Sequence, residues 1–220
     1  MKPQNFSLGY PFRFKENVYT DLIEEQAHVW IDNYTSLPED ERLKYKKSHF
    51  GIFAANFYPE ANFEQLVPIC RWILACFIFD DYYGSYRLPE LGKICQKTNK
   101  IFEGNSAELE NEEFLKLFAI GRKEFLPIVS QYWMERFINH NCLWLEAMKT
   151  ETFYNHKQEL HYPLIEEYIS IREDVSGGKV MCDFLEIVSG FIMPEEIFLH
   201  PTIVRLRQLI SLMMWKRRSN

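Results

Sequence analysis

Apolar residues recur at helical spacing along most of this chain of 220 residues. No stretch shows the sustained alternation of apolar and polar residues that is typical of a half-buried β-strand. Proline, glycine and polar clusters interrupt the pattern and mark helix ends. The pattern predicts helices over 18–34, over a short segment from 38, and over 63–84, 88–102, 112–124, 128–155, 164–175, 179–191 and 202–215. We therefore expect an all-α fold, a bundle of roughly nine or ten helices around an aromatic centre.

The chain contains no internal repeat and no low-complexity linker that would divide it. Its first residues include two prolines and a glycine, a composition that is typical of an extended arm. Its last residues are basic. The sequence therefore predicts one helical domain over 17–215, with an N-terminal arm at 1–16 and a basic tail at 216–220.

Two adjacent acids, Asp80 and Asp81, end the apolar segment 63–84. On a helix, Asp80 falls on the same narrow stripe as Phe77 and the apolar residues before it, whereas Asp81 lies to one side. A carboxylate that points inward needs a positive partner. One interpretation is an ion pair with a basic residue of another helix, or a helix end that reaches water. The other is a divalent metal at the mouth of an apolar cavity.

A second inward charge, Arg172, shares a helical face with the apolar residues of segment 164–175. Its guanidinium suits a phosphate or a carboxylate, so either an anionic ligand or a structural pair with a buried acid is expected. Directly afterwards, Ser176, Gly177 and Gly178 break the helix, and a broken helix exposes backbone carbonyls. Together these features describe a pocket for an apolar molecule with an anionic head held through metal, which an isoprenyl diphosphate fits.

The composition of the chain excludes further classes of function. Aromatic residues make up 16% of the chain, so the interior must be walled by rings. The net charge of −6 and the lack of a basic stripe argue against nucleic-acid binding. The five cysteines and six histidines form no CxxC or HExxH motif, and we expect His140 to be a core histidine rather than a ligand. Neither a signal peptide nor a membrane span is predicted, so we expect a cytoplasmic protein.

The residues resemble the class I terpene synthases of the microbial, single-domain type. The resemblance begins at Trp30, runs through 58–61, Trp72 and 77–81, resumes at 163–172, and continues into 209–215. It implies an enzyme that ionises and cyclises geranyl, farnesyl or geranylgeranyl diphosphate and releases diphosphate. The resemblance also implies that Asp80 is the principal ligand of Mg²⁺, or of Mn²⁺, and that Asp81 is its weaker partner. It implies that Arg172 senses the diphosphate and that Ser176 and Gly177 lie beside the substrate. The candidate cavity walls are Phe77, Trp72 and Trp133.

The sequence departs from the family pattern in two places. Tyr83, Gly84 and Ser85 stand where the family carries a further acid, and after Trp215 the basic tail replaces the expected Asn-Asp…Ser…Glu motif. We therefore expect a C-terminally truncated member that lacks the second metal motif and the last helices. Its activity would be impaired, and exposed apolar surface would favour self-association. The alternatives are an inactive paralogue that at most binds isoprenyl diphosphate, and an unrelated helical interaction module.

Overall fold

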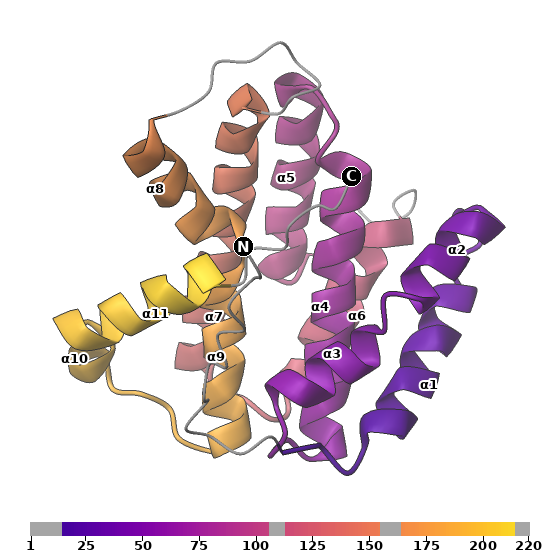
Figure 1. Cartoon of the computed structure of the whole chain (residues 1–220), viewed down its shortest axis with the longest axis horizontal. Coiled ribbons are helices and arrows are strands. Elements are labelled where there is room, and N and C mark those ends of the chain that lie inside the picture. Colours follow the sequence, from indigo (N-terminus) through magenta and orange to yellow (C-terminus); the bar gives the residue numbers. More distant parts are fainter. Residues whose placement is uncertain (1–14, 106–112, 155–163, 214–220) are drawn as a thin grey trace, which may run out of the picture.

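The computed structural model describes residues 15–105, 113–154 and 164–213. This part of the chain is a bundle of helices without a β-strand, which confirms the predicted all-α fold (Figure 1). Its α-helices are α1 (Thr20–Asp32), α2 (Glu39–Lys46), α3 (Phe50–Phe57), α4 (Phe63–Tyr83), α5 (Leu88–Phe102), α6 (Lys116–Phe125), α7 (Gln131–Glu151), α8 (Ile165–Val175), α9 (Gly178–Ser189), α10 (Glu195–Phe198) and α11 (Pro201–Met213). Two 3₁₀ turns, η2 (Glu113–Leu115) and η3 (Thr152–Tyr154), precede α6 and follow α7.

Helix α4 lies at the centre of the bundle and contacts α1, α3, α6 and α9. Its start is fixed by a capping box: the Asn62 side chain accepts a hydrogen bond from the Gln65 backbone, and the Gln65 side chain accepts one from the Asn62 backbone. Most of its side chains as far as Phe79 are buried. The helix therefore brings its C-terminal turn, with Asp80 and Asp81, to a defined place at one end of the bundle (Figure 1).

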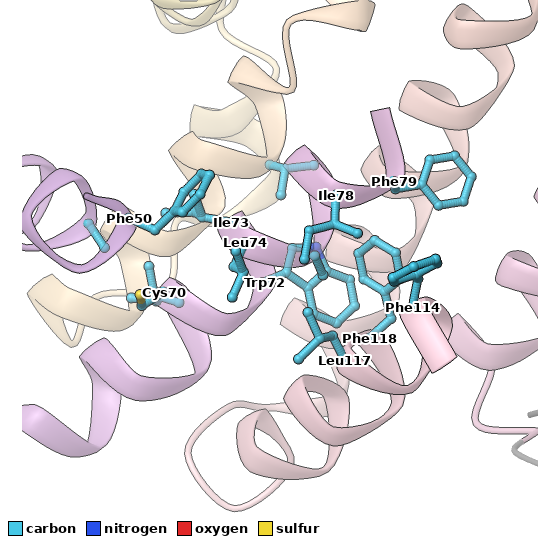
Figure 2. Packing of buried hydrophobic residues seen from close by; sticks show 14 of the residues in the cluster. Phe50, Cys70, Trp72, Ile73, Leu74, Ile78, Phe79, Phe114, Leu117 and Phe118 are labelled. Carbon is cyan, nitrogen blue, oxygen red and sulfur yellow. The ribbon is translucent and has the colours of Figure 1, made fainter. Parts of the chain in front are cut away.

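The core is built from aromatic rings around Trp72. Its indole is 1% exposed, and the rings that pack against it belong to α5, α6 and α7: Phe102, Phe118, Phe125 and Phe137. Figure 2 shows Trp72 beside Phe118, with Leu117 and Phe114 nearby. The indole Nε1 donates to Asn141 Oδ1 at 2.9 Å, which satisfies a buried donor that would otherwise be costly.

Two predicted segments differ from the structure. The short helix expected from residue 38 is two helices, α2 and α3, because His49 between them adopts a left-handed conformation with φ of 53°. The helix expected over 128–155 is shorter: Ser130 caps the first turn of α7 by accepting from the Trp133 backbone N–H at 3.2 Å, and the α-helix ends at Glu151. Residue 155 lies outside the described residues.

The other predicted helices are confirmed with small shifts at their ends as far as they are described; residue 112 and residues 214–215 lie outside the described residues. Most of the proposed N-terminal arm and all of the basic tail lie outside the described residues, so both stay predictions. Within the described ranges, no helix combines the length and the apolarity that a membrane crossing requires.

Candidate functional site

Asp80 lies in the last turn of α4 and is half-buried. Its backbone carbonyl accepts a hydrogen bond from Gly84 N at 2.9 Å, which closes the helix. Burial raises the pKa of the Cys76 thiol, one turn earlier, and the negative charge of Asp80 raises it further. The partial burial of Asp80 agrees with its place on the apolar stripe.

Asp81 has different surroundings from its neighbour. Its side chain is 37% exposed, and its Oδ2 lies 3.1 Å from Lys44 Nζ of α2. Tyr45, also on α2, lies close enough that burial, first, and the negative charge of Asp81, second, raise the pKa of the tyrosine. Asp81 is thus turned toward α2 and is already paired. Its role as a weaker metal partner stays a prediction.

Phe77 lies one turn before Asp80 and is half-buried. Its ring packs against Phe50 and Phe53 of α3, with centroid separations of 5.2 Å and 6.1 Å. Among the three aromatic residues predicted to wall a cavity, Phe77 is the one that shares the acid-bearing end of α4. The role of Phe77 as a cavity wall stays a prediction.

The other two predicted wall residues lie inside the aromatic core. Trp72 is enclosed as described above. Trp133 is completely buried, stacks on Phe137 with centroids 4.6 Å apart, and donates through Nε1 to the Asp183 carbonyl at 3.1 Å. These contacts give both tryptophans a packing role, and a helical aromatic stripe cannot distinguish such a role from a cavity wall.

Arg172 lies near the end of α8 and is partly buried. Its NH1 is 3.2 Å from Glu151 Oε1 at the end of α7, and the two side chains are 20% and 36% exposed. The guanidinium Nε is buried and has no hydrogen-bond partner among the described residues. The structure thus shows an ion pair for Arg172, but its partner Glu151 is partly exposed and is not the buried acid of the structural alternative.

The break between α8 and α9 is confirmed. Gly177 has φ of 70°, a left-handed conformation that glycine adopts at no steric cost. Ser176 N donates to the Arg172 carbonyl at 3.1 Å, and Ser176 Oγ accepts from Gly178 N at 3.2 Å. The turn therefore holds Ser176, Gly177 and the positive end of the helix α9 directly after Arg172.

The chemistry of these groups limits what metal they could hold. In the part of the chain that the structure describes, no three His, Cys, Asp or Glu side chains are grouped so that they could hold a metal ion together. Asp80 alone offers an inward carboxylate at the end of α4. One carboxylate is enough for Mg²⁺ when phosphate and water oxygens complete its coordination. The residues therefore fit a metal that arrives with an anionic ligand, and they do not form an all-protein cage.

The local sequence pattern gave no sign of the partners of these residues. Lys44 and Tyr45 reach Asp81 from α2, and Glu151 reaches Arg172 from α7. His140 was expected in the core and is confirmed there: it is 7% exposed, and its Nδ1 lies 2.6 Å from Asp183 Oδ2.

Proteins of known activity resemble this chain over most of its length. It is 28% identical over 215 residues to a germacrene A synthase from Nostoc punctiforme, covering 91% of this chain and 63% of that protein. It is 25% identical over 206 residues to a (+)-T-muurolol synthase from Roseiflexus castenholzii, covering 91% of this chain and 62% of that protein. The chain thus spans less than two thirds of the length of these relatives.

Solved structures show the same fold. Germacradien-4-ol synthase from Streptomyces citricolor superimposes with a TM-score of 0.80 at 20% identity, covering 95% of this chain and 69% of that one. The SVS_A2 protein, obtained by ancestral sequence reconstruction, superimposes with a TM-score of 0.84 at 21% identity, covering 93% of this chain and 64% of that one. The family model described as terpene synthase family 2, C-terminal metal binding, matches residues 71–216, more than half of the chain. This chain therefore belongs to terpene synthase family 2.

Proposed function

We propose that this chain binds the diphosphate end of an isoprenyl diphosphate together with Mg²⁺, or Mn²⁺, and serves its ionisation and cyclisation to a terpene. One observation carries the proposal. A half-buried acid at the end of α4 and an arginine directly before the α8–α9 break both lie within the segment that the family model matches. The name of the related (+)-T-muurolol synthase states that it cyclises farnesyl diphosphate, so farnesyl diphosphate is the first substrate to test.

Asp80 would hold the metal through its carboxylate. When bound, the metal neutralises charge on the diphosphate and makes it a better leaving group. Asp80 suits this role because it is half-buried at the end of an apolar helix, where an ion is partly shielded from water. Asp81 contributes less because Lys44 and Tyr45 already engage it.

Arg172 would bind the diphosphate by exchanging its partner. Its ion pair with Glu151 is partly exposed to solvent, and ion pairs near the surface contribute little to stability. A diphosphate carries more charge than one carboxylate and offers several acceptors to the planar guanidinium. Exchange of Glu151 for diphosphate would also give the buried Nε an acceptor that it lacks among the described residues.

The helix break would complete the anionic end of the site. The first N–H groups of α9 have no partner within the helix, and its N-terminus attracts negative charge. Gly177 has no side chain that would block an approaching phosphate. Phe77 would lie toward the apolar part of the substrate, where a ring face stabilises an allylic cation.

Isothermal titration calorimetry tests this proposal directly. The titrant is an analogue of farnesyl diphosphate in which sulfur replaces the bridging oxygen, so that binding is measured without turnover. We expect Mg²⁺-dependent binding that weakens by roughly 10- to 100-fold in Asp80→Asn and in Arg172→Met, because a contact to a charged group contributes about 1.5–3 kcal/mol. Asp40→Asn is the matched control, since Asp40 is an exposed acid on α2.

Two results would contradict the proposal. The first is binding that does not depend on Mg²⁺. The second is equal affinity in Asp80→Asn and Asp40→Asn, which would identify Asp80 as an acid with a purely structural role. Far-UV circular dichroism of each variant verifies that the helices are intact.

A further inference from the structure

A buried group of charged side chains joins α7, α9 and α11; we call it the Asp183 cluster. It consists of Arg136 and His140 of α7, Asp183 and Glu186 of α9, and Arg207 of α11. The Asp183 side chain is 1% exposed, and it meets His140 Nδ1 at 2.6 Å, Arg207 NH2 at 3.4 Å and Arg136 Nε at 3.8 Å. Arg136 also pairs with Glu186. A buried carboxylate needs such partners, so the cluster fixes how these helices meet.

Phe198 of α10 covers the cluster on one side. The guanidinium carbon of Arg207 lies 3.8 Å from the ring centroid, and that of Arg136 lies 4.4 Å from it. The imidazole of His140 stacks on the same ring at 5.8 Å. Cation–π contacts of this kind gain strength when they are partly desolvated. Phe198 and Arg207 are therefore two of the residues that attach the α10–α11 segment to α7 and α9.

The same arginine reaches the first turn of α9. Arg207 NH2 lies 3.5 Å from the Lys179 carbonyl, two residues beyond Gly177. One turn further along α11, Ser211 packs directly against Gly178: a Cβ added to that glycine would lie 2.3 Å from Ser211 Oγ and 2.5 Å from Ser211 Cα. Helix α11 thus supports the α8–α9 break from one side, by a polar contact and by close backbone approach.

We infer that Arg207 is a positioning residue for the diphosphate end of the site: it holds α11 against α9 and so fixes the turn of Ser176 and Gly177. The inference rests on the proposed function of that turn. Among the described residues, Arg207 is the side chain of α11 that reaches Asp183. His140 and Arg136, which also face Asp183, come from α7. Removal of Arg207 therefore leaves Asp183 paired with α7 but takes away the polar contact between α11 and the first turn of α9.

Arg207→Met, which removes the charge and keeps the length of the side chain, is the test variant. Arg205→Met is its matched control, because Arg205 is exposed on the same helix. The probe is inorganic diphosphate with Mg²⁺, titrated by calorimetry. We expect the wild-type protein and Arg205→Met to bind equally, and Arg207→Met to bind at least about tenfold more weakly. Arg207→Lys, which restores the positive charge, should recover part of the loss.

Hydrogen exchange separates a positioning role from a general loss of stability. In Arg207→Met, amides of residues 176–182 should exchange faster, while amides of α4 and α5 remain as protected as in the wild-type protein. Equal affinity of Arg207→Met and Arg205→Met, or a uniform increase in exchange throughout the bundle, would overturn the inference. If Arg207→Met does not fold, Arg207→Gln replaces it, and failure of both to fold would equally overturn the inference.

A different result is expected if the proposed function itself is wrong. In that case the wild-type protein itself would not bind diphosphate in a Mg²⁺-dependent way, and the inference would fall with it. Binding by the wild-type protein that is unaffected in Arg207→Met would reject the positioning role alone.

Discussion

At the scale of single residues, the adjacent acids Asp80 and Asp81 differ in burial and in their partners. Asp80 is half-buried on the apolar stripe of α4, whereas Asp81 is turned toward Lys44 and Tyr45 of α2. Their positions differ by about 100° around the helix. Asp80 is therefore the acid that we assign to the proposed site, and Asp81 is held at the surface by α2. A metal bound here would depend on Asp80 and on oxygens that the ligand supplies.

Arg71 illustrates a buried charge with a structural role. Its Nε and NH2 donate to the two carboxylate oxygens of Glu124 at 2.8 Å and 2.9 Å, and its guanidinium lies 3.9 Å from the Trp30 ring centroid. Glu124→Gln leaves the guanidinium charge without compensation, and we expect a loss of about 2 kcal/mol in the free energy of unfolding. Urea denaturation of Glu124→Gln and of the wild-type protein at neutral pH measures this loss. Asp32→Asn breaks an exposed pair with Lys46 and should cost less than about 0.5 kcal/mol.

A pH dependence follows from the buried cysteines. Burial raises the pKa of Cys95 from its ordinary value of 9.0 to about 11, and burial also raises the pKa of Cys70 and Cys76. The unfolded chain loses these protons first. The stabilisation is thus complete below pH 9 and declines as the pH rises toward 11. Between pH 8 and pH 10.5, Cys95 should lower the free energy of unfolding by on the order of 1–2 kcal/mol. Urea denaturation at the two pH values measures this change. Cys95→Ala should make the decline less steep, and an equal decline in Cys95→Ala and the wild-type protein would contradict the assignment.

At the scale of elements, close backbone approach holds helices together at positions that lack a side chain. A Cβ on Gly51 of α3 would lie 2.4 Å from Glu24 Cα of α1, whereas a Cβ on Gly92 of α5 would meet nothing within 4 Å. The first glycine is required by packing between two helices. The second lies in a helix interior, where it only lowers helix propensity.

These two glycines predict opposite effects of the same substitution. Gly51→Ala forces α1 and α3 apart, and we expect it to lower the free energy of unfolding by about 1–3 kcal/mol. Gly92→Ala should raise it by about 0.5–1 kcal/mol, because alanine has the higher helix propensity. Thermal unfolding followed by circular dichroism compares both with the wild-type protein. A melting temperature that falls in both variants, or in neither, would show that the packing of α1 on α3 is not as described.

The sequence pattern predicts helices better than it predicts their partners. Helix α5 begins and ends at the predicted residues because a proline in its first turn marks the start. The split between α2 and α3 was missed because it depends on the left-handed backbone of His49, which no sequence pattern indicated. The Asp183 cluster was missed for another reason: Arg136 and Glu186 are 50 positions apart and meet only in the fold. Acids at 183 and 186 within an apolar helix were the available signal.

At the scale of the whole molecule, helices α8 and α11 are among the elements that expose apolar side chains. Helix α8 has no buried residue, and its Ile165 and Ile169 are 68% and 43% exposed. Leu199, after α10, and Leu206 of α11 are 62% and 51% exposed. An exposed apolar surface favours association, so the expected self-association stays a prediction. The chain spans less than two thirds of the relatives in which this fold is seen, so the account concerns binding of the diphosphate end.

The central claim is that the end of α4 and the α8–α9 break bind one metal–diphosphate complex. Paramagnetic broadening by Mn²⁺, added with inorganic diphosphate to ¹⁵N-labelled protein, tests it most directly. We predict that amide signals of residues 78–84 and 172–179 broaden together, that they remain sharp without diphosphate, and that Asp80→Asn abolishes the effect. Broadening confined to exposed acids such as those of α2, or at one of the two segments alone, would contradict the claim that they form a single site.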